Sequence, residues 1–188
     1  DHEGRDVQAL LDFVAQQPEA ELDRTADPRG GMVGFSYGGG IQLSVAATDC
    51  RVDALVPGLA WHSLHTSLAK ADIVKAGWAN FLYSAAVTGG GELAPELVRS
   101  AEVDLEQGVL QPETVEWYES RGPGDRMASV DVPTLFVSGT VDTLFTLDET
   151  ISNYRSLRDR GIPTAMLWFC GGHGACLTKP GDQEQFSK

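Results

Sequence analysis

The residues Gly34-Phe35-Ser36-Tyr37-Gly38 match the pattern G-x-S-x-G. In enzymes that use this pattern, the serine lies on a sharp turn between a strand and a helix, where its hydroxyl is exposed to attack a carbonyl carbon. The pattern is short enough to arise by chance, so its surroundings matter. An apolar run at 31–35 precedes Ser36, and a helical pattern of small residues at 41–47 follows it. We therefore predict that Ser36 is a nucleophile; the alternative is a glycine-rich loop with an inert serine.

A serine hydroxyl attacks efficiently only when a base accepts its proton and a carboxylate orients that base. In chains with this turn the order is serine, acid, histidine, and the acid and the histidine each follow a strand. Of the four histidines, His173 alone follows a late apolar run, 164–169, and glycines flank it. His173 is the predicted base, and the alternative is a structural histidine in a loop.

The predicted acid is Asp142, which lies in a short loop after the apolar run 134–137. Asp148 is the alternative. It belongs to the stretch Thr-Leu-Asp-Glu, which has the composition of a helix start, where a carboxylate stabilises the free N–H groups. The serine, the acid and the histidine thus occur in the required order. A chance occurrence of all three placements is less probable than a chance occurrence of the G-x-S-x-G pattern alone.

A negative charge develops on the carbonyl oxygen during such an attack, and N–H groups must point at that oxygen. The backbone N–H of Tyr37, directly after the serine, is one predicted donor. The usual second donor follows an earlier strand, which is not in this sequence. Trp61, His62 and His65 follow the second strand at its carboxyl end, where open parallel sheets bind ligands. We predict that these three residues line the substrate pocket.

The order of the elements predicts an α/β fold. Strands at 31–35, 54–57, 134–137 and 164–169 alternate with helical patterns, which favours parallel pairing through right-handed crossovers. Helical patterns dominate the stretch 61–126, where no strand is evident. We therefore divide the chain into a core segment at 1–60, a helical cap insertion at 61–126 and a second core segment at 127–188.

Composition narrows the choice of partners. The chain has 188 residues and a formal net charge of -13. This charge argues against nucleic acid or an anionic membrane as a partner, because binding to phosphate groups needs an excess of Lys and Arg. No apolar run is long enough to span a bilayer. The chain begins at Asp1, and the segment 4–17 reads as a helix already under way, so we expect an upstream part of the same hydrolase as its partner.

The three cysteines allow at most one internal pair. Cys170 and Cys176 are close enough in the sequence to close a loop around His173, and a disulfide there would favour a secreted protein. Free thiols in a reducing compartment are the alternative. Cys50 is predicted to be a core residue.

Three stretches carry a family resemblance: Gly-Met-Val-Gly-Phe-Ser-Tyr-Gly-Gly around Ser36, Gly-Thr-Val-Asp-Thr-Leu-Phe around Asp142, and Gly-Gly-His-Gly around His173. Together they resemble the Xaa-Pro dipeptidyl-peptidase and cocaine-esterase family of α/β-hydrolases. The resemblance implies that the four strands are the last four of a larger sheet, with the N-terminal strands missing and most helices on one face. It also implies Ser36, Asp142 and His173 as the catalytic triad, and an upstream tyrosine hydroxyl as the second oxyanion donor.

The resemblance further implies hydrolysis of esters or amides, including short peptides with proline in second position, without a metal; we expect no cofactor. Our leading expectation is a serine hydrolase that cleaves a small carboxylic ester through an acyl-enzyme. Xaa-Pro peptide cleavage is the first alternative, ranked lower because the sequence shows no C-terminal jelly-roll domain. The second alternative is an α/β-hydrolase-like binding module without catalysis.

Overall fold

The computed structural model describes residues 2–176. These residues form two compact units. The first, which we call the sheet unit, combines the residues up to His62 with those from Pro123 onward; the second, the helical unit, is Ser63–Gly122. The cap role of the helical segment 61–126 remains a prediction.

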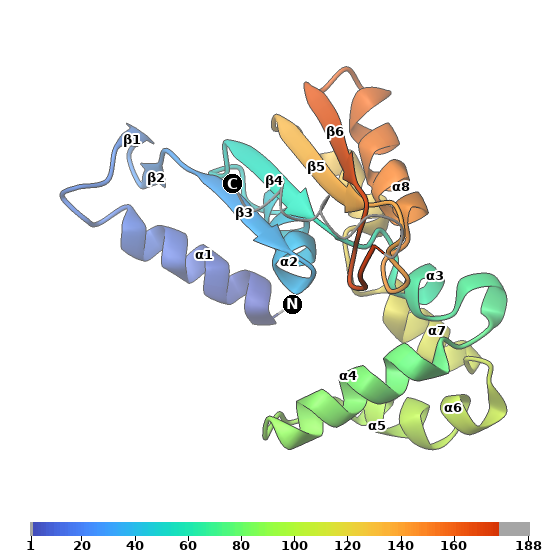
Figure 1. The fold of residues 1–188 in the computed structure, drawn as a ribbon. Helices are drawn as coiled ribbons and strands as arrows, with labels where there is room; N and C mark the ends of the chain where they lie inside the picture. Colours follow the sequence, from blue (N-terminus) through green and yellow to red (C-terminus); the bar gives the residue numbers. More distant parts are fainter. Residues whose placement is uncertain (1, 177–188) are drawn as a thin grey trace. The chain divides into compact units, whose positions relative to one another are not determined.

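Four parallel strands form the centre of the sheet unit: β3 (Gly31–Phe35), β4 (Ala54–Gly58), β5 (Thr134–Gly139) and β6 (Thr164–Phe169). They lie side by side in the order β3-β4-β5-β6, as Figure 1 shows. Parallel neighbours need crossover connections, and their carboxyl ends meet at one edge of the sheet. The predicted α/β class and the predicted parallel pairing are confirmed.

Helices cover one face of this sheet. They are α1 (His2–Val14), α2 (Tyr37–Ala46), α8 (Leu147–Arg158) and the 3-10 helix η2 (Gly124–Ser129). Side chains from these helices and from the sheet form one hydrophobic core, whose fully buried members include Leu43, Leu55, Met127, Phe136 and Leu157. Burying each such side chain contributes about 1.5–3 kcal/mol. This core fixes the strand ends relative to the helices that follow them.

The opposite face of the sheet carries apolar side chains that are open to solvent. Successive side chains of a strand alternate between the two faces, and four of them point away from the helices: Val33, Phe35, Leu135 and Leu167. Their exposed fractions are 73%, 47%, 38% and 42%, respectively. We call this surface the open sheet face.

Arg51, in the loop between α2 and β4, ties that loop to α1. Its guanidinium donates to the carboxylate of Asp12 on α1 at 2.6 Å and to that of Asp49 at 2.7 Å. The hydrogen bond from Arg51 holds the pKa of the Asp49 carboxyl below its usual value. The loop and the helix are therefore joined by charge as well as by apolar packing.

The polar composition of the stretch 19–29, after Pro18, predicts a loop. The structure shows instead a small antiparallel hairpin made of β1 (Leu22–Arg24) and β2 (Asp27–Pro28). The guanidinium of Arg24 donates to the carboxylate of Asp27 at 2.7 Å, across the turn. The prediction was wrong here because strands of three and two residues are too short to show an alternation of apolar residues.

Cys50 is not a core residue, so that prediction was wrong too. Its side chain is exposed between α2 and β4, and its Sγ lies 3.7 Å from the guanidinium of Arg24. Residue type favours burial of a free cysteine, but the position of this one in a helix-to-strand loop places it outside the core.

The helical unit consists of α3 (Leu64–Leu68), the 3-10 helix η1 (Lys70–Asp72), α4 (Ala76–Thr88), α5 (Pro95–Glu102), α6 (Asp104–Gln107) and α7 (Pro112–Glu119). The sequence predicts one helix over 67–86, but the structure breaks it. Ala71 and Asp72 have φ angles of 54° and 61°, in the left-handed region that residues other than glycine rarely adopt. None of the helices described in residues 2–176 is both long enough and apolar enough to cross a bilayer.

Candidate active site

Ser36 lies on a tight turn between β3 and α2. Its φ and ψ angles are 56° and -119°, a conformation that costs free energy for any residue with a side chain. The N–H of Ser36 donates to the carbonyl of Gly58 at 2.9 Å, and its own carbonyl accepts from the N–H of Gly40 at 3.0 Å. A strained serine at a strand-to-helix turn is the geometry that the G-x-S-x-G pattern requires.

Gln42 of α2 links this turn to the sheet by hydrogen bonds. The sequence did not predict this role for Gln42. Its side chain is fully buried. Its Nε2 donates to the carbonyl oxygens of Gly34 at 3.3 Å and Gly38 at 2.8 Å, while its Oε1 accepts from the N–H of Val56 at 3.1 Å. A buried amide with three hydrogen bonds favours one backbone arrangement over others. The only signal in the sequence is a polar residue inside an apolar helical pattern.

Asp142, in the loop after β5, has a fully buried carboxylate. Its Oδ1 accepts from the N–H groups of Leu144 at 2.8 Å and Phe145 at 2.9 Å. Its Oδ2 accepts from the backbone N–H of His173 at 3.1 Å and lies 2.7 Å from Nδ1 of the same residue. Four nitrogen donors thus compensate for the water that a carboxylate loses on burial.

His173 connects Asp142 to Ser36. The Nε2 of its ring lies 2.7 Å from the Oγ of Ser36. A carboxylate only accepts hydrogen bonds, so Nδ1 carries the hydrogen shared with Asp142, and Nε2 of the neutral ring directs a lone pair at the serine hydroxyl. The three side chains predicted as a triad are therefore brought together.

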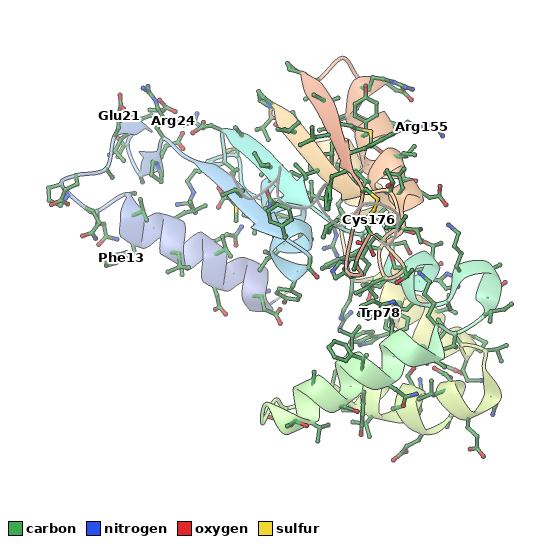
Figure 2. The ribbon with its side chains drawn as sticks, in the orientation of Figure 1. Phe13, Glu21, Arg24, Trp78, Arg155 and Cys176 are labelled. Carbon is green, nitrogen blue, oxygen red and sulfur yellow. A yellow bond between two sulfur atoms is a disulfide. The ribbon has the colours of Figure 1, made fainter. Side chains whose placement is uncertain are left out.

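The loop that carries His173 is tightly constrained. Gly172 has a φ of 152°, and a methyl group there would lie 2.5 Å from the Cα of Asp142, so only glycine fits. A disulfide joins Cys170 and Cys176, whose Cα atoms are 5.4 Å apart; Figure 2 shows it as a yellow bond beside Cys176. The structure thus contains the cysteine pair and not the two free thiols, and the pair brackets His173.

Three aromatic side chains follow one another beside the triad. The ring of Phe145 meets that of His173 edge-on, with centroids 5.1 Å apart, and its centroid also lies 5.1 Å from that of Trp61. The ring of Trp61 in turn lies 6.2 Å from that of Tyr37. We call Tyr37, Trp61 and Phe145 the aromatic wall. Phe145 was not among the predicted site residues, although it ends the Gly-Thr-Val-Asp-Thr-Leu-Phe stretch that pointed to the acid.

Tyr37 is the first residue of α2. The N–H groups in the first turn of a helix have no partner within that helix, so the backbone N–H next to the serine is available to a ligand. Burial, and to a smaller extent the carboxylate of Glu3 on α1, raises the pKa of the Tyr37 hydroxyl.

His62 and His65, the other predicted pocket residues, lie in different units. In the sheet unit, the Nδ1 of His62 lies 2.8 Å from the Oδ1 of Asn153. His65 lies on α3 of the helical unit, where its two ring nitrogens lie 3.3 Å from the carboxylates of Asp72 and Glu119. That either histidine binds substrate remains a prediction.

Asp148, the alternative acid, lies in the first turn of α8 and is exposed. The carboxylate in contact with His173 is that of Asp142. Within residues 2–176, no three His, Cys, Asp or Glu side chains are grouped so that they would hold a metal ion.

The sheet, the turn at Ser36 and the loops of Asp142 and His173 are those of an α/β-hydrolase. The sequence matches the model of the X-Pro dipeptidyl-peptidase family, S15, over residues 1–175. The chain therefore belongs to the X-Pro dipeptidyl-peptidase family, and with it to the serine hydrolases of the α/β-hydrolase type. No curated protein matches the sequence.

Solved structures of similar fold include peptidases and an esterase. The acylaminoacyl peptidase of Pyrococcus horikoshii has a TM-score of 0.65 and 19% identity, over 97% of this chain and 26% of its own. Dipeptidyl peptidase 4 of Porphyromonas gingivalis has a TM-score of 0.62 and 15% identity, over 98% of this chain and 21% of its own. An esterase of Pyrococcus furiosus has a TM-score of 0.53 and 16% identity, over 92% of this chain and 54% of its own. These likenesses confirm the α/β-hydrolase fold, and this chain spans about a quarter of the length of the first peptidase.

The two glycines of the G-x-S-x-G pattern differ in what they tolerate. A methyl group on Gly34 would lie 2.8 Å from the carbonyl oxygen of Gly38, whereas one on Gly38 would meet nothing within 4 Å. We expect Gly34→Ala to lower the free energy of unfolding by about 1–3 kcal/mol, because the backbone must shift. The control, Gly38→Ala, should change it by less than about 1 kcal/mol. Urea unfolding measures both, and equal losses would contradict this geometry of the turn.

The disulfide is expected to stabilise the folded chain by restricting the unfolded one. In the chain-entropy account, closing so short a loop contributes about 2 kcal/mol. We expect the double replacement Cys170→Ser and Cys176→Ser to lower the free energy of unfolding by that amount in the absence of reductant. Cys50→Ser, at an exposed free thiol, is the control and should change it by less than about 0.5 kcal/mol. A double variant as stable as its parent would show that the pair does not form in solution.

Proposed function

We propose that this chain carries the catalytic centre of a serine hydrolase. Ser36 attacks the carbonyl carbon of the substrate while the Nε2 of His173 accepts the hydroxyl proton. The leaving group departs with that proton, and water then attacks the acyl-enzyme with the same histidine as base. The observation that carries this proposal is the continuous path from Asp142 through His173 to Ser36, with both nitrogen–oxygen distances at 2.7 Å.

In this proposal Asp142 keeps the hydrogen on Nδ1 of His173 and stabilises the imidazolium that forms during the reaction. The N–H of Tyr37 binds the oxyanion, since it directly follows the nucleophile and lies at the start of α2, where the helix dipole favours negative charge. A tyrosine hydroxyl from the upstream part of the hydrolase supplies the second oxyanion donor.

The acyl group of the substrate binds beside the ring of Tyr37, which is 57% exposed. Trp61 and Phe145 are buried, at 8% and 6% exposed, and pack against the rings of Tyr37 and His173, respectively. That His62 and His65 bind substrate, and that the helical segment 61–126 is a cap, are proposals that rest on the position of these residues after β4 in the sequence.

Xaa-Pro peptides are our first candidate substrates, and small carboxylic esters are the second. The family match over residues 1–175 supports the peptides. The similarity of fold to an esterase is the reason for retaining small carboxylic esters as the second candidate substrates. The sequence patterns alone rank esters first, and the family match is the reason for reversing that order.

Covalent labelling tests the nucleophile. A fluorophosphonate reacts readily only with a serine that a base activates, so we expect an adduct on Ser36, located by mass spectrometry, in the hydrolase that contains this chain together with its upstream part. Ser36→Ala should remove the adduct, and His173→Gln should slow labelling by at least about a hundredfold. A folded chain with no adduct on Ser36 would favour the binding module without catalysis.

Nitroanilide hydrolysis tests the substrate class. We expect kcat/KM for Ala-Pro nitroanilide to exceed that for Ala-Ala nitroanilide by at least about tenfold. The reason is that a proline ring buries more apolar surface in the acyl pocket than the methyl group of alanine does. Short-chain nitrophenyl esters represent the second class. Turnover of these esters without measurable cleavage of either anilide would restore the ester to first rank.

A further inference from the structure

Phe145 lies in the loop between β5 and α8 and contacts both Asp142 and His173. Its backbone N–H donates to the Oδ1 of Asp142 at 2.9 Å. Its ring meets the ring of His173 at an interplanar angle of 90°, with centroids 5.1 Å apart, which is the edge-to-face arrangement that aromatic rings favour. The two contacts come from different parts of the residue, so a change of side chain removes only the second.

The ring of Phe145 is packed firmly from behind. It is 6% exposed, and its centroid lies 5.1 Å from that of Trp61, which is 8% exposed. A methyl group on Gly40 would overlap the ring of Trp61, so helix α2 lies directly against the indole. Because a close-packed interior yields little, Phe145 cannot move away from His173 without displacing Trp61 against α2.

Three contacts with described residues bear on the ring of His173. Its Nδ1 lies 2.7 Å from Asp142, its Nε2 lies 2.7 Å from the Oγ of Ser36, and the ring packs against Phe145. The two hydrogen bonds fix an axis through the ring, and the aromatic contact opposes rotation about that axis. The glycines on either side of His173 have no side chains that could support it.

The contact with Ser36 is lost during the proposed reaction. In the acyl-enzyme the Oγ of Ser36 is an ester oxygen without a hydrogen, and the Nε2 of the neutral ring is also an acceptor, so no hydrogen bond joins them. Water must then attack the acyl carbon and give its proton to Nε2, which returns the proton to Oγ as the ester bond breaks. At this stage Asp142 holds the ring of His173 at one atom, and Phe145 supports it from the side.

We propose that Phe145 is a positioning residue: its ring keeps the imidazole of His173 aimed at the reacting carbonyl while Ser36 is acylated. This inference rests on the proposed function, because it requires an acyl-enzyme. A role confined to stability would leave the two chemical steps equally affected. A positioning role slows deacylation more than acylation, because Ser36 itself orients the ring only in the first step.

Phe145→Leu is the decisive variant, because it removes the ring but keeps an apolar side chain and the backbone N–H to Asp142. A nitrophenyl carbamate separates the two steps: release of nitrophenol reports the transfer to Ser36, and the return of activity after the reagent is removed reports the slow hydrolysis of the carbamoyl-enzyme. Both are measured in the hydrolase that contains this chain together with its upstream part. We expect F145L to slow the hydrolysis step at least about tenfold and the transfer step by less than about threefold.

Phe136→Leu is the matched control. Phe136 of β5 is fully buried and meets the ring of Tyr154 at 81°, with centroids 6.5 Å apart, in the core below the site. The same substitution there removes a buried ring without touching Asp142 or His173, and it should change either rate by less than about twofold.

Two further variants of Phe145 complete the test. Phe145→Tyr retains the ring and should restore the hydrolysis rate to within about threefold of the parent. If F145L does not fold, Phe145→Met carries the test, because methionine fills a similar volume without a ring.

Hydrolysis that F145L slows no more than the transfer step, or no more than F136L does, would overturn the inference and leave Phe145 with a structural role alone. A parent hydrolase whose Ser36 is not carbamoylated, as judged by mass spectrometry, would instead overturn the proposed function, and the inference with it. Because carbamoylation of the parent is measured first, the two failures are distinguishable.

Discussion

The buried carboxylate of Asp142 is the constraint on which the rest of the site depends. A carboxylate without water needs donors around both oxygens, and the chain supplies them from the loop that leads into α8 and from the loop after β6. Both loops reach the same point because β5 and β6 are parallel neighbours that end together. The backbone arrangement that satisfies this carboxylate is also the one that aims the ring of His173 at Ser36.

A second constraint acts where β3 and β4 leave the sheet. Phe35 and Gly58 are paired in register, so Ser36 and Leu59 are the next residues on two neighbouring strands. Both have left-handed φ angles, 56° and 49°. Such backbone persists only when the surroundings hold it. Buried amide side chains of two helices bond to the backbone beside these residues: Gln42 of α2 to Gly34, Gly38 and Val56, and Asn153 of α8 to the carbonyl of Trp61.

The strand ends that carry Ser36, Asp142 and His173 were predictable because short apolar runs and flanking glycines mark them in the sequence. Gln42, Phe145 and Asn153 were not predictable. Phe145 and Asn153 act through contacts with residues far away in the chain, Gln42 acts through backbone groups of a turn and a neighbouring strand, and a polar or aromatic residue has no local signature for such contacts. The hairpin at 22–28 was missed because its strands, of three and two residues, are too short to show an alternation of apolar residues. The break between α3 and α4 depends on two left-handed residues, neither of which is glycine.

On the open sheet face, Val33, Phe35, Leu135 and Leu167 are exposed in the part of the molecule that residues 2–176 make up, and apolar surface exposed in this way favours association with another segment of the protein or with a second copy. The formal net charge of -13 opposes it, because like-charged molecules repel one another at a distance. Added salt shortens the reach of that repulsion from about 10 Å at 0.1 M to about 3 Å at 1 M and leaves the apolar attraction in place. High ionic strength therefore weakens the charge repulsion between two copies of the chain more than it weakens their apolar attraction.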